Sequence, residues 1–351
     1  GDFSDLLKIG PQYQIYDPMT RAPARNGRFT VQPLPGNIIP PSRINSIATR
    51  LLQFWPLPNV PGTIDGVNNL DRTNETETLD YYNHVGRVDH NFSARHRMFA
   101  RVNTYNRYSH WGDWFHTPAT GFYEDWLQRG ASIDDVYEIG PAAILNLRYS
   151  FYRLTIHSFP RPESLGFDLA TLGFPKKYAD AIDPSVRAFP FVSIEGYQGS
   201  LNNWWKFPSQ NHSLEANLTS VRGRHSVKIG GDLQVYQSFY RQPSNASTGA
   251  FQFSSTWTRG PFDNSPSAPI GQGIASMLLG LPTGGLVERN ASFAQQSTVY
   301  SAYFHDDWRV TKRLTLNVGL RYELDGRTTE RFNRSVRGYD FKTPSPLAEQ
   351  V

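Results

Sequence analysis

Side chains alternate between apolar and polar along several stretches of the chain, and this period of two constrains the fold more than any other feature. Near the C-terminal end, Leu316, Val318 and Leu320 occupy alternate positions. Asn317 and Arg321 lie between and beyond them. Because successive side chains of a strand point to opposite faces, such a stretch predicts a strand with one apolar and one polar face.

The predicted strands come in four pairs, and each pair is joined by a short turn. The strands are His84–Phe92 with Arg97–Tyr105, Gly130–Ile139 with Ala143–His157, Asn211–Val221 with Ser226–Tyr240, and Ser297–Val310 with Leu314–Glu323. The long connections between pairs are residues 106–129, 158–210 and 241–296. Strands of about 10–15 residues are much longer than the globular average of about 5–6. Short turns alternating with long loops are typical of an outer-membrane barrel, with periplasmic turns and extracellular loops.

The sequence thus predicts an all-β fold. We expect an antiparallel meander of about eight long strands, forming part of a large transmembrane β-barrel, with the first and last strands as open edges. Closure into an eight-stranded barrel is the other possibility. The absence of an apolar run of about 18 residues excludes a transmembrane helix but not a barrel strand. The absence of cysteine excludes a disulfide scaffold.

Three regions follow from this pattern. Residues 1–80 are rich in proline and predict an irregular extracellular loop region, with a short helix near 43–55. Ser42 is its expected cap, and Pro56 its stop. Residues 81–326 predict the partial barrel of four hairpins, and 327–351 the start of the next loop.

Two strands fit the alternation less well, because each contains adjacent aspartates. These are Asp134-Asp135 and Asp306-Asp307. Adjacent side chains of a strand face opposite sides, so neither pair is expected to act on one substrate. Phe92 and Trp308 precede turns, and they predict an interfacial aromatic girdle, with ordinary cross-strand packing as the alternative.

No catalytic site is predicted. The sequence has no H-E-x-x-H or G-x-S-x-G motif, and its nine histidines show no metal-binding spacing. We expect no enzyme activity, no metal and no cofactor. The net charge is only +4 and the basic residues are scattered, which argues against nucleic acid as a partner.

The tryptophans of the long loops are the better candidates for ligand contact, because rings at the outer mouth of a barrel could stack on sugars or other flat ligands. They are Trp111, Trp114, Trp126, Trp204, Trp205 and Trp257. Packing of the loops, or an outer aromatic girdle, is the alternative role. A second group is predicted to face the lumen and to form a cross-strand charge ladder: Arg87, Asp89, Arg101, Arg148, Asp232 and Arg321.

Several segments resemble TonB-dependent outer-membrane receptors, specifically the Oar-like barrel proteins. They are Pro35–Asn45 followed by Leu51–Asn59, His84–Phe92 with Met98–Arg101, Gly223–Asp232, Ala275–Pro282, and Tyr303–Val310 through Leu314–Glu323. The resemblance implies a 22-stranded barrel closed by a plug domain, in which TonB grips an N-terminal box. No plug pattern precedes Pro35, so the chain is expected to be a middle section of such a barrel.

The resulting hypothesis is an outer-membrane receptor that binds and imports a bulky nutrient, such as an oligosaccharide or an iron chelate. Its expected partners are outer-membrane lipid, a plug domain, the remaining barrel strands and, through an N-terminal region, the TonB system. The alternatives are a structural or adhesive surface β-protein and a soluble carbohydrate-binding β-sandwich.

Overall fold

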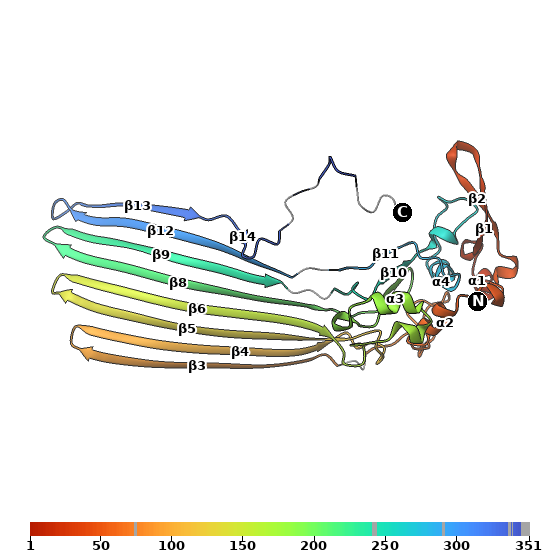
Figure 1. The fold of residues 1–351 in the computed structure, drawn as a ribbon, viewed down its shortest axis with the longest axis horizontal. Helices are drawn as coiled ribbons and strands as arrows, with labels where there is room; N and C mark the ends of the chain where they lie inside the picture. Colours follow the sequence, from red (N-terminus) through yellow and green to blue (C-terminus); the bar gives the residue numbers. More distant parts are fainter. Residues whose placement is uncertain (74–75, 241–243, 290–291, 336–337, 339, 345–351) are drawn as a thin grey trace.

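Eight long strands form one antiparallel sheet (Figure 1), in a computed structural model that describes residues 1–73, 76–240, 244–289, 292–335, 338 and 340–344. Their bounds are β3 (Thr78–Ser93), β4 (His96–Trp111), β5 (Phe122–Gly140), β6 (Ala143–Pro160), β8 (Trp205–Arg222), β9 (His225–Tyr240), β12 (Phe293–Arg309) and β13 (Thr315–Asp325). Each pairs with the long strand before and after it in the chain, which confirms the predicted meander. Among the described residues, β3 and β13 remain the open edges of the sheet.

The four hairpin turns lie at one end of the sheet (Figure 1). The residue pairing shows that each turn is displaced along the strands relative to the one before. His96, at the first turn, is opposite Tyr137, which in turn is opposite Leu145 on β6. The second turn begins at Ala143, which is two residues beyond Leu145 along β6. The third and fourth turns are displaced by two residues and one residue in the same direction. With 3.3 Å per residue and strands about 4.8 Å apart, this stagger corresponds to a strand tilt of roughly 30°. Closed membrane barrels have a tilt of about 35–45°, so the stagger is close to that of a barrel wall.

Directly opposed residues on neighbouring strands point to the same face of the sheet, so the pairing shows which of the two faces each side chain of the long strands occupies. One row across the apolar face consists of Leu218, Ile229, Phe304 and Leu320. Leu316, Val318 and Leu320 are 41%, 57% and 75% exposed, so they do not belong to a compact core. An apolar sheet face of this kind excludes the soluble β-sandwich, whose inner faces would be buried against each other.

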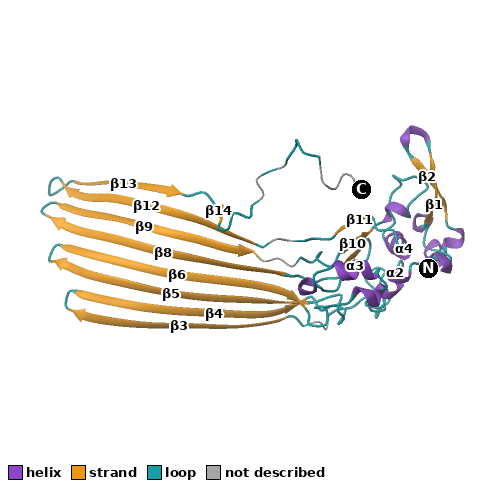
Figure 2. Ribbon diagram, in the orientation of Figure 1, coloured by secondary structure: helices purple, strands orange, loops and turns teal. Residues whose placement is uncertain are grey.

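The ends of the strands opposite the turns carry a second folded unit, here called the head (Figure 2). It consists of residues 1–73 and the described residues of the three connections between hairpins. Its helices are α1 (Ser4–Leu7), α2 (Ser46–Leu52), α3 (Lys176–Ala181) and α4 (Gln272–Leu278). Its 3-10 turns are η1 (Pro11–Tyr13), η2 (Arg25–Gly27), η3 (Pro35–Asn37), η4 (Pro41–Arg43), η5 (Leu169–Leu172), η6 (Pro184–Val186) and η7 (Ser255–Trp257). Its strands are β1 (Tyr16–Pro23) paired with β2 (Phe29–Pro33), and the small sheet of β7 (Phe191–Ile194), β10 (Ala250–Phe253) and β11 (Gly284–Leu286).

The structure corrects several predicted boundaries. Residues 1–80 are not simply irregular, because they contain the β1–β2 hairpin and two short helices. The helix predicted near 43–55 is shorter, and its cap is Asn45, whose side chain accepts hydrogen bonds from the amides of Ile47 and Ala48, rather than Ser42. Six of the long strands, β3, β4, β5, β6, β8 and β12, also extend three or more residues beyond their predicted bounds at the head end. Backbone pairing continues past the alternating segment, where the side-chain pattern no longer signals a strand.

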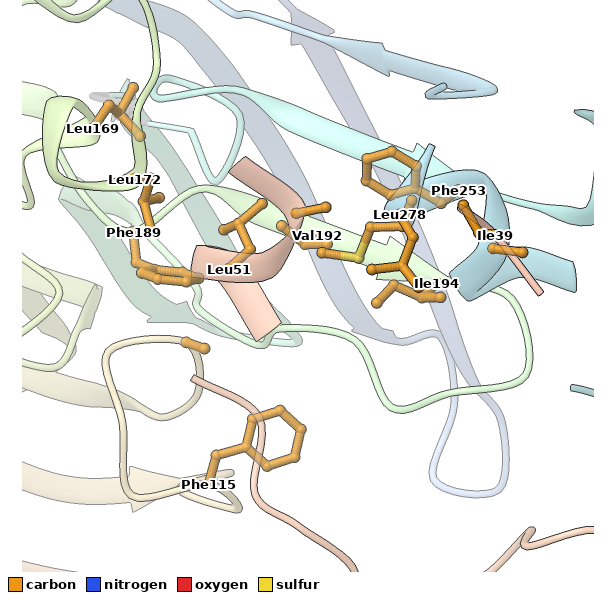
Figure 3. Close-up of a cluster of buried hydrophobic side chains, with 14 of the residues drawn as sticks. Ile39, Leu51, Phe115, Leu169, Leu172, Phe189, Val192, Ile194, Phe253 and Leu278 are labelled. Atoms are coloured by element: carbon orange, nitrogen blue, oxygen red, sulfur yellow. The ribbon is translucent and has the colours of Figure 1, made fainter. Parts of the chain in front are cut away.

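The hydrophobic core lies in the head, outside the eight long strands (Figure 3). It joins residues from the N-terminal segment and from all three connections: Ile15, Leu34, Ile39, Ala48, Leu51, Phe115, Ala119, Leu169, Leu172, Ala179, Ile182, Phe189, Val192, Ile194, Phe253, Ala275, Met277 and Leu278. Segments that read as separate loops therefore form one packed unit.

The side chain of Asn37 links three parts of the N-terminal segment to one another inside the head. Its side chain is fully buried, accepts from the amide of Ile15 at 2.6 Å and from Gln14 Nε2 at 3.0 Å, and donates to the carbonyls of Phe3 and Tyr13. Its φ of 62° is in the left-handed region, which asparagine tolerates better than most residues. Asn37 belongs to the Pro35–Asn45 segment that resembles the receptor family, so that motif has a structural role here.

The predicted loop after the last long strand begins with β14 (Thr329–Glu330), which pairs back onto β12. Of residues 327–351, positions 336–337, 339 and 345–351 lie outside the described residues. The Glu330 carboxylate accepts from Arg334 Nη2 at 2.7 Å and from the amides of Ala294 and Phe332 at 2.9 and 2.8 Å. The guanidinium of Arg334 and these amides lower the pKa of Glu330 from its ordinary 4.5 to about 2.

This network predicts a pH-dependent release of β14. Because the folded-state pKa is lowered, its stabilisation is present above about pH 4.5 and is lost as the pH falls toward 2. We expect the protection factors of the Ala294 and Phe332 amides against hydrogen exchange to fall over this range in the wild-type protein. In Glu330→Gln, both protection factors should already be low at pH 7 and should change little on acidification. Unaltered protection at pH 2 in the wild type would rule out this role for Glu330.

Candidate functional site

The six residues predicted to face the lumen all lie on the polar face of the sheet, opposite to Leu316, Val318 and Leu320. These are Arg87, Asp89, Arg101, Arg148, Asp232 and Arg321. Arg87 is directly opposite Arg101. Arg87 pairs with Asp89 on its own strand at 2.6 Å and lies 3.9 Å from the centroid of the Phe99 ring.

The centre of the polar face contains a network of carboxylates and guanidinium groups. Arg148 Nε donates to Asp134 at 2.6 Å, and Nη1 lies 3.8 Å from Glu215 on the next strand. Asp134 is only 5% exposed and also accepts from Asn146 Nδ2 at 3.0 Å. Arg148 and Asn146 therefore give the buried carboxylate of Asp134 an opposite charge and a hydrogen-bond donor, which offset the cost of removing it from water.

A second group in this network lies nearer to β13. Arg321 Nε donates to Glu323 at 2.6 Å, and Nη2 lies 3.4 Å from Asp232, two strands away. Tyr303, from the strand between them, donates its hydroxyl to Asn217 at 2.8 Å. The charged and amide side chains thus form a nearly continuous polar surface across β5 to β13.

Each of the two aspartate pairs that disturbed the alternation places one carboxylate on the apolar face, where a histidine on the neighbouring strand contacts it. Asp135 is on the apolar face and lies 2.7 Å from His96 Nε2, and Asp306 on the same face lies 2.6 Å from His225 Nδ1. Their neighbours Asp134 and Asp307 point to the polar face. Sequence reasoning missed these His–Asp contacts because strand order, rather than spacing along the chain, brings the partners together.

Aromatic rings surround both His–Asp contacts near the turns. Phe92 stacks on His96 with centroids 4.7 Å apart, and Trp308 stacks on His225 at 5.4 Å. Tyr137 meets His96 edge-on at 5.4 Å. These rings lie at the turn end of the sheet, where an interfacial girdle is expected.

The structure brings two of the predicted tryptophans together. Trp111 at the end of β4 and Trp114 in the following connection line a hollow of about 350 Å³. Arg72 lies over the Trp114 ring, with its guanidinium carbon 4.5 Å from the centroid. Asp113 and Glu77 also line this hollow, which we call the Trp111–Trp114 hollow. It combines aromatic faces with both signs of charge.

The hollow is held by contacts between connections. Asp113 forms an ion pair with Arg161 from the connection after β6. The backbone amide of Gly121 donates to the carbonyl of Leu201, and the amide of Leu201 donates to that of Ala119. No sequence pattern pointed to Arg72, Asp113 or Arg161, because their contacts depend on the packing of three separate segments.

The remaining predicted tryptophans are placed elsewhere. Trp126 is in β5 on the polar face, where its Nε1 donates to Glu124 at 2.7 Å and Arg107 lies 4.1 Å above its ring. Trp205 begins β8, and the backbone amide of Trp204 donates to Asn245. Trp257 donates to the carbonyl of Pro282, a contact within its own connection.

Trp111, Trp126 and Trp205 therefore lie in strands and not in loops, which corrects the predicted loop boundaries. Trp55, which was not singled out from the sequence, donates to the carbonyl of Gln198 at 2.7 Å and lies 5.6 Å from the Phe115 ring. It fastens the N-terminal segment to two connections of the head.

None of the helices within the described ranges has the length and apolar character to span a bilayer. Across the same part of the chain, no group of three His, Cys, Asp or Glu side chains is placed to hold a metal ion.

Long staggered strands with one apolar and one polar face, short turns at one end and a packed head at the other define an integral β-barrel protein of the outer-membrane type. A family model described as "Outer membrane beta barrel domain" matches residues 1–351. The chain belongs to this family, and the protein is located in the outer membrane.

Two solved structures are distantly similar to the chain. The outer membrane transporter YddB from Escherichia coli matches with 10% identity and a TM-score of 0.43, over 72% of this chain and 29% of that chain. The open form of the ferric-catecholate import receptor Fiu from E. coli K12 matches with 11% identity and a TM-score of 0.40, over 73% and 38%. The chain thus spans well under half the length of either protein. No curated protein sequence matches it.

Proposed function

We propose that the chain is the ligand-binding barrel portion of a TonB-dependent, Oar-like receptor that binds and imports a bulky nutrient. An oligosaccharide or an iron chelate is the expected class of ligand. Catalysis is not part of this proposal, and binding followed by transport is the whole of the function.

The observation that carries the proposal is the packed head above a polar sheet face. The N-terminal segment and three connections share one core, so the Trp111–Trp114 hollow is held open by a folded support. Binding sites on rigid supports lose less conformational entropy when the ligand binds. A chain whose loops served only to cover the barrel would not need such a core.

The hollow offers chemistry suited to a flat, polar ligand. The two indole rings provide surfaces for stacking on a sugar ring or a catechol. Arg72, Glu77 and Asp113 provide donors and acceptors around them. This combination of aromatic faces and few polar groups is typical of small-molecule sites.

The charged network of the polar face supports transport beyond binding. In a complete barrel, the polar face lines the interior, where Arg148 and Arg321 would contact a plug domain or the passing ligand. Movement of that plug would be driven by TonB through a region N-terminal to the barrel. Outer-membrane lipid and the remaining strands complete the set of proposed partners.

The binding step is tested with Trp111→Ala combined with Trp114→Ala in the full-length protein. The probes are a ferric tris-catecholate chelate and a set of defined oligosaccharides, measured by calorimetry. Loss of two stacking surfaces is expected to weaken binding of the accepted probe by about tenfold or more. Trp308→Ala, at the turn end of the sheet, is the matched control and should bind as the wild type does.

The transport step is tested by uptake of the same probe into cells with and without TonB. Uptake that depends on TonB supports the receptor. Binding at the head without uptake would support the adhesive or structural alternative. Equal binding by the double variant and the wild type would refute the assignment of the Trp111–Trp114 hollow.

A further inference from the structure

A row of polar side chains crosses the apolar face of the sheet on the head side. Following directly opposed partners from β3 to β12, the row consists of His84, Thr104, Arg129, Arg153, Gln210, Gln237 and Gln296. Four residues nearer the turns, the corresponding row is apolar or aromatic throughout: Val88, Ala100, Ile133, Tyr149, Leu214, Leu233, Tyr300 and Leu324. The row thus forms a polar border across the apolar face at this level.

The strand tilt allows the height of this row along the membrane normal to be calculated on β5 and β6. These two strands lie side by side in the sheet (Figure 1). Arg129 is eight residues from Tyr137 of the turn-side aromatic cluster. Eight residues of 3.3 Å each, tilted by about 30°, span roughly 23 Å along the membrane normal. The apolar band of an outer-membrane barrel is about 25 Å tall. Since turns are periplasmic, Arg129 and its partner Arg153 lie at the external edge of the hydrocarbon layer.

The two arginines carry like charges directly opposite each other on adjacent strands, as Arg87 and Arg101 do on the polar face. Like-charged partners destabilise a sheet unless another group neutralises them. Both side chains are exposed, and neither makes an ion pair with a carboxylate among the described residues. By contrast, Arg148 and Arg321 on the polar face each contact two acids.

The hydrogen bonds of the pair leave most of its donors unused. Arg129 Nη1 donates to Asn106 Oδ1 and to the carbonyl of Gln128, both at 2.7 Å. Arg153 Nη1 donates to Gln210 Oε1 at 3.3 Å. A guanidinium has five N–H donors, so each arginine retains several for another acceptor. The two guanidinium groups donate to residues on opposite neighbouring strands, Arg129 to Asn106 on β4 and Arg153 to Gln210 on β8.

The rest of the row differs from the arginine pair because its glutamines satisfy one another. Gln210 Nε2 donates to Gln237 at 2.6 Å, and Gln237 Nε2 donates to Gln296 at 2.7 Å. Four residues further toward the head, Asp125 and Lys206 share a row of the apolar face and contribute opposite charges. The positive charge of this border is thus concentrated at Arg129 and Arg153.

We propose that Arg129 and Arg153 bind the phosphate headgroup of a glycolipid in the external leaflet of the outer membrane. The phosphate would accept charge-assisted hydrogen bonds from both guanidinium groups while the acyl chains contact Ile133 and Tyr149 below. Arginine suits phosphate because its planar fork can bind two oxygens at once. This lipid site is separate from the ligand site in the head, and it would persist if the proposed transport function failed.

The test uses the full-length protein in detergent with three probes: bis-phosphorylated lipid A, its dephosphorylated form, and inorganic phosphate. Binding is measured by native mass spectrometry. The wild type is expected to bind the phosphorylated glycolipid, and Arg129→Gln combined with Arg153→Gln to bind it at least about tenfold more weakly. Arg129→Lys with Arg153→Lys should retain part of the affinity, since charge remains without the fork.

The matched control is Arg87→Gln with Arg101→Gln, because these residues form the directly opposed arginine pair of the polar face. This control should bind the glycolipid as the wild type does. Heat-modifiable migration on electrophoresis shows that each variant is folded. Equal glycolipid binding by the Arg129/Arg153 glutamine variant, or equal binding of the dephosphorylated form, overturns the proposal. Displacement of the glycolipid by inorganic phosphate at similar concentration would show a free-anion site and also overturn it.

Discussion

Leu320→Arg is expected to lower the free energy of unfolding in lipid vesicles by about 2–4 kcal/mol, the cost of an arginine facing lipid near the middle of the bilayer. Leu320 is directly opposite Phe304 and 75% exposed on the apolar face. It lies four residues from the row of Trp308 and Leu316, or about 11 Å along the membrane normal at a tilt of about 30°. Its side chain therefore lies near the middle of the hydrocarbon layer.

The control for this change is Asn317→Arg on the same strand. Asn317 points to the polar face and is directly opposite Asp307, so a guanidinium there gains a carboxylate neighbour. We expect its unfolding free energy in guanidinium chloride titrations to remain within about 0.5 kcal/mol of the wild type. If both arginine variants are destabilised equally, the assignment of the two faces is wrong.

Phe189→Ala is expected to destabilise the head by about 3–5 kcal/mol, the usual cost of removing a buried phenylalanine ring. Phe189 is fully buried in the head core. Its ring centroid lies 4.9 Å from that of Phe54 and 5.0 Å from that of Phe167, so the change removes contacts to the N-terminal segment and within its own connection. Hydrogen exchange should accelerate in the N-terminal segment and in all three connections, while the long strands remain protected.

Phe262→Ala is the matched control, because this ring is in the same head but 46% exposed. Its exchange pattern should resemble that of the wild type. Loss of protection in the strands β5 and β6 of Phe189→Ala would show that the head and the sheet fold as one cooperative unit, contrary to this prediction.

Side-chain alternation predicted the sheet correctly because it reports directly on each strand. Leu316, Val318 and Leu320 required an apolar environment on one side, and Asn317 and Arg321 required water on the other. The turn positions were equally local. The order of the strands then followed from short hairpins and sequential pairing.

The candidate site was only partly predictable. The indole rings of Trp111 and Trp114 were recognisable as ligand-type side chains, but Arg72 and Asp113 joined them only through packing of distant segments. Trp126 had the same appearance in the sequence, yet it is engaged by Glu124 and Arg107 on a strand. Tryptophan alone does not distinguish a binding surface from a structural contact.

The sequence by itself determined the two-faced strands, the turns and the location in a membrane, because these depend on the period of two in neighbouring residues. The tertiary structure alone decided that Ile15, Phe115, Phe189 and Met277 share one core, and that Asp135 and Asp306 on the apolar face have histidine partners. Such contacts join residues far apart in the chain. Their formation depends on strand order and stagger, which no local pattern of side chains encodes.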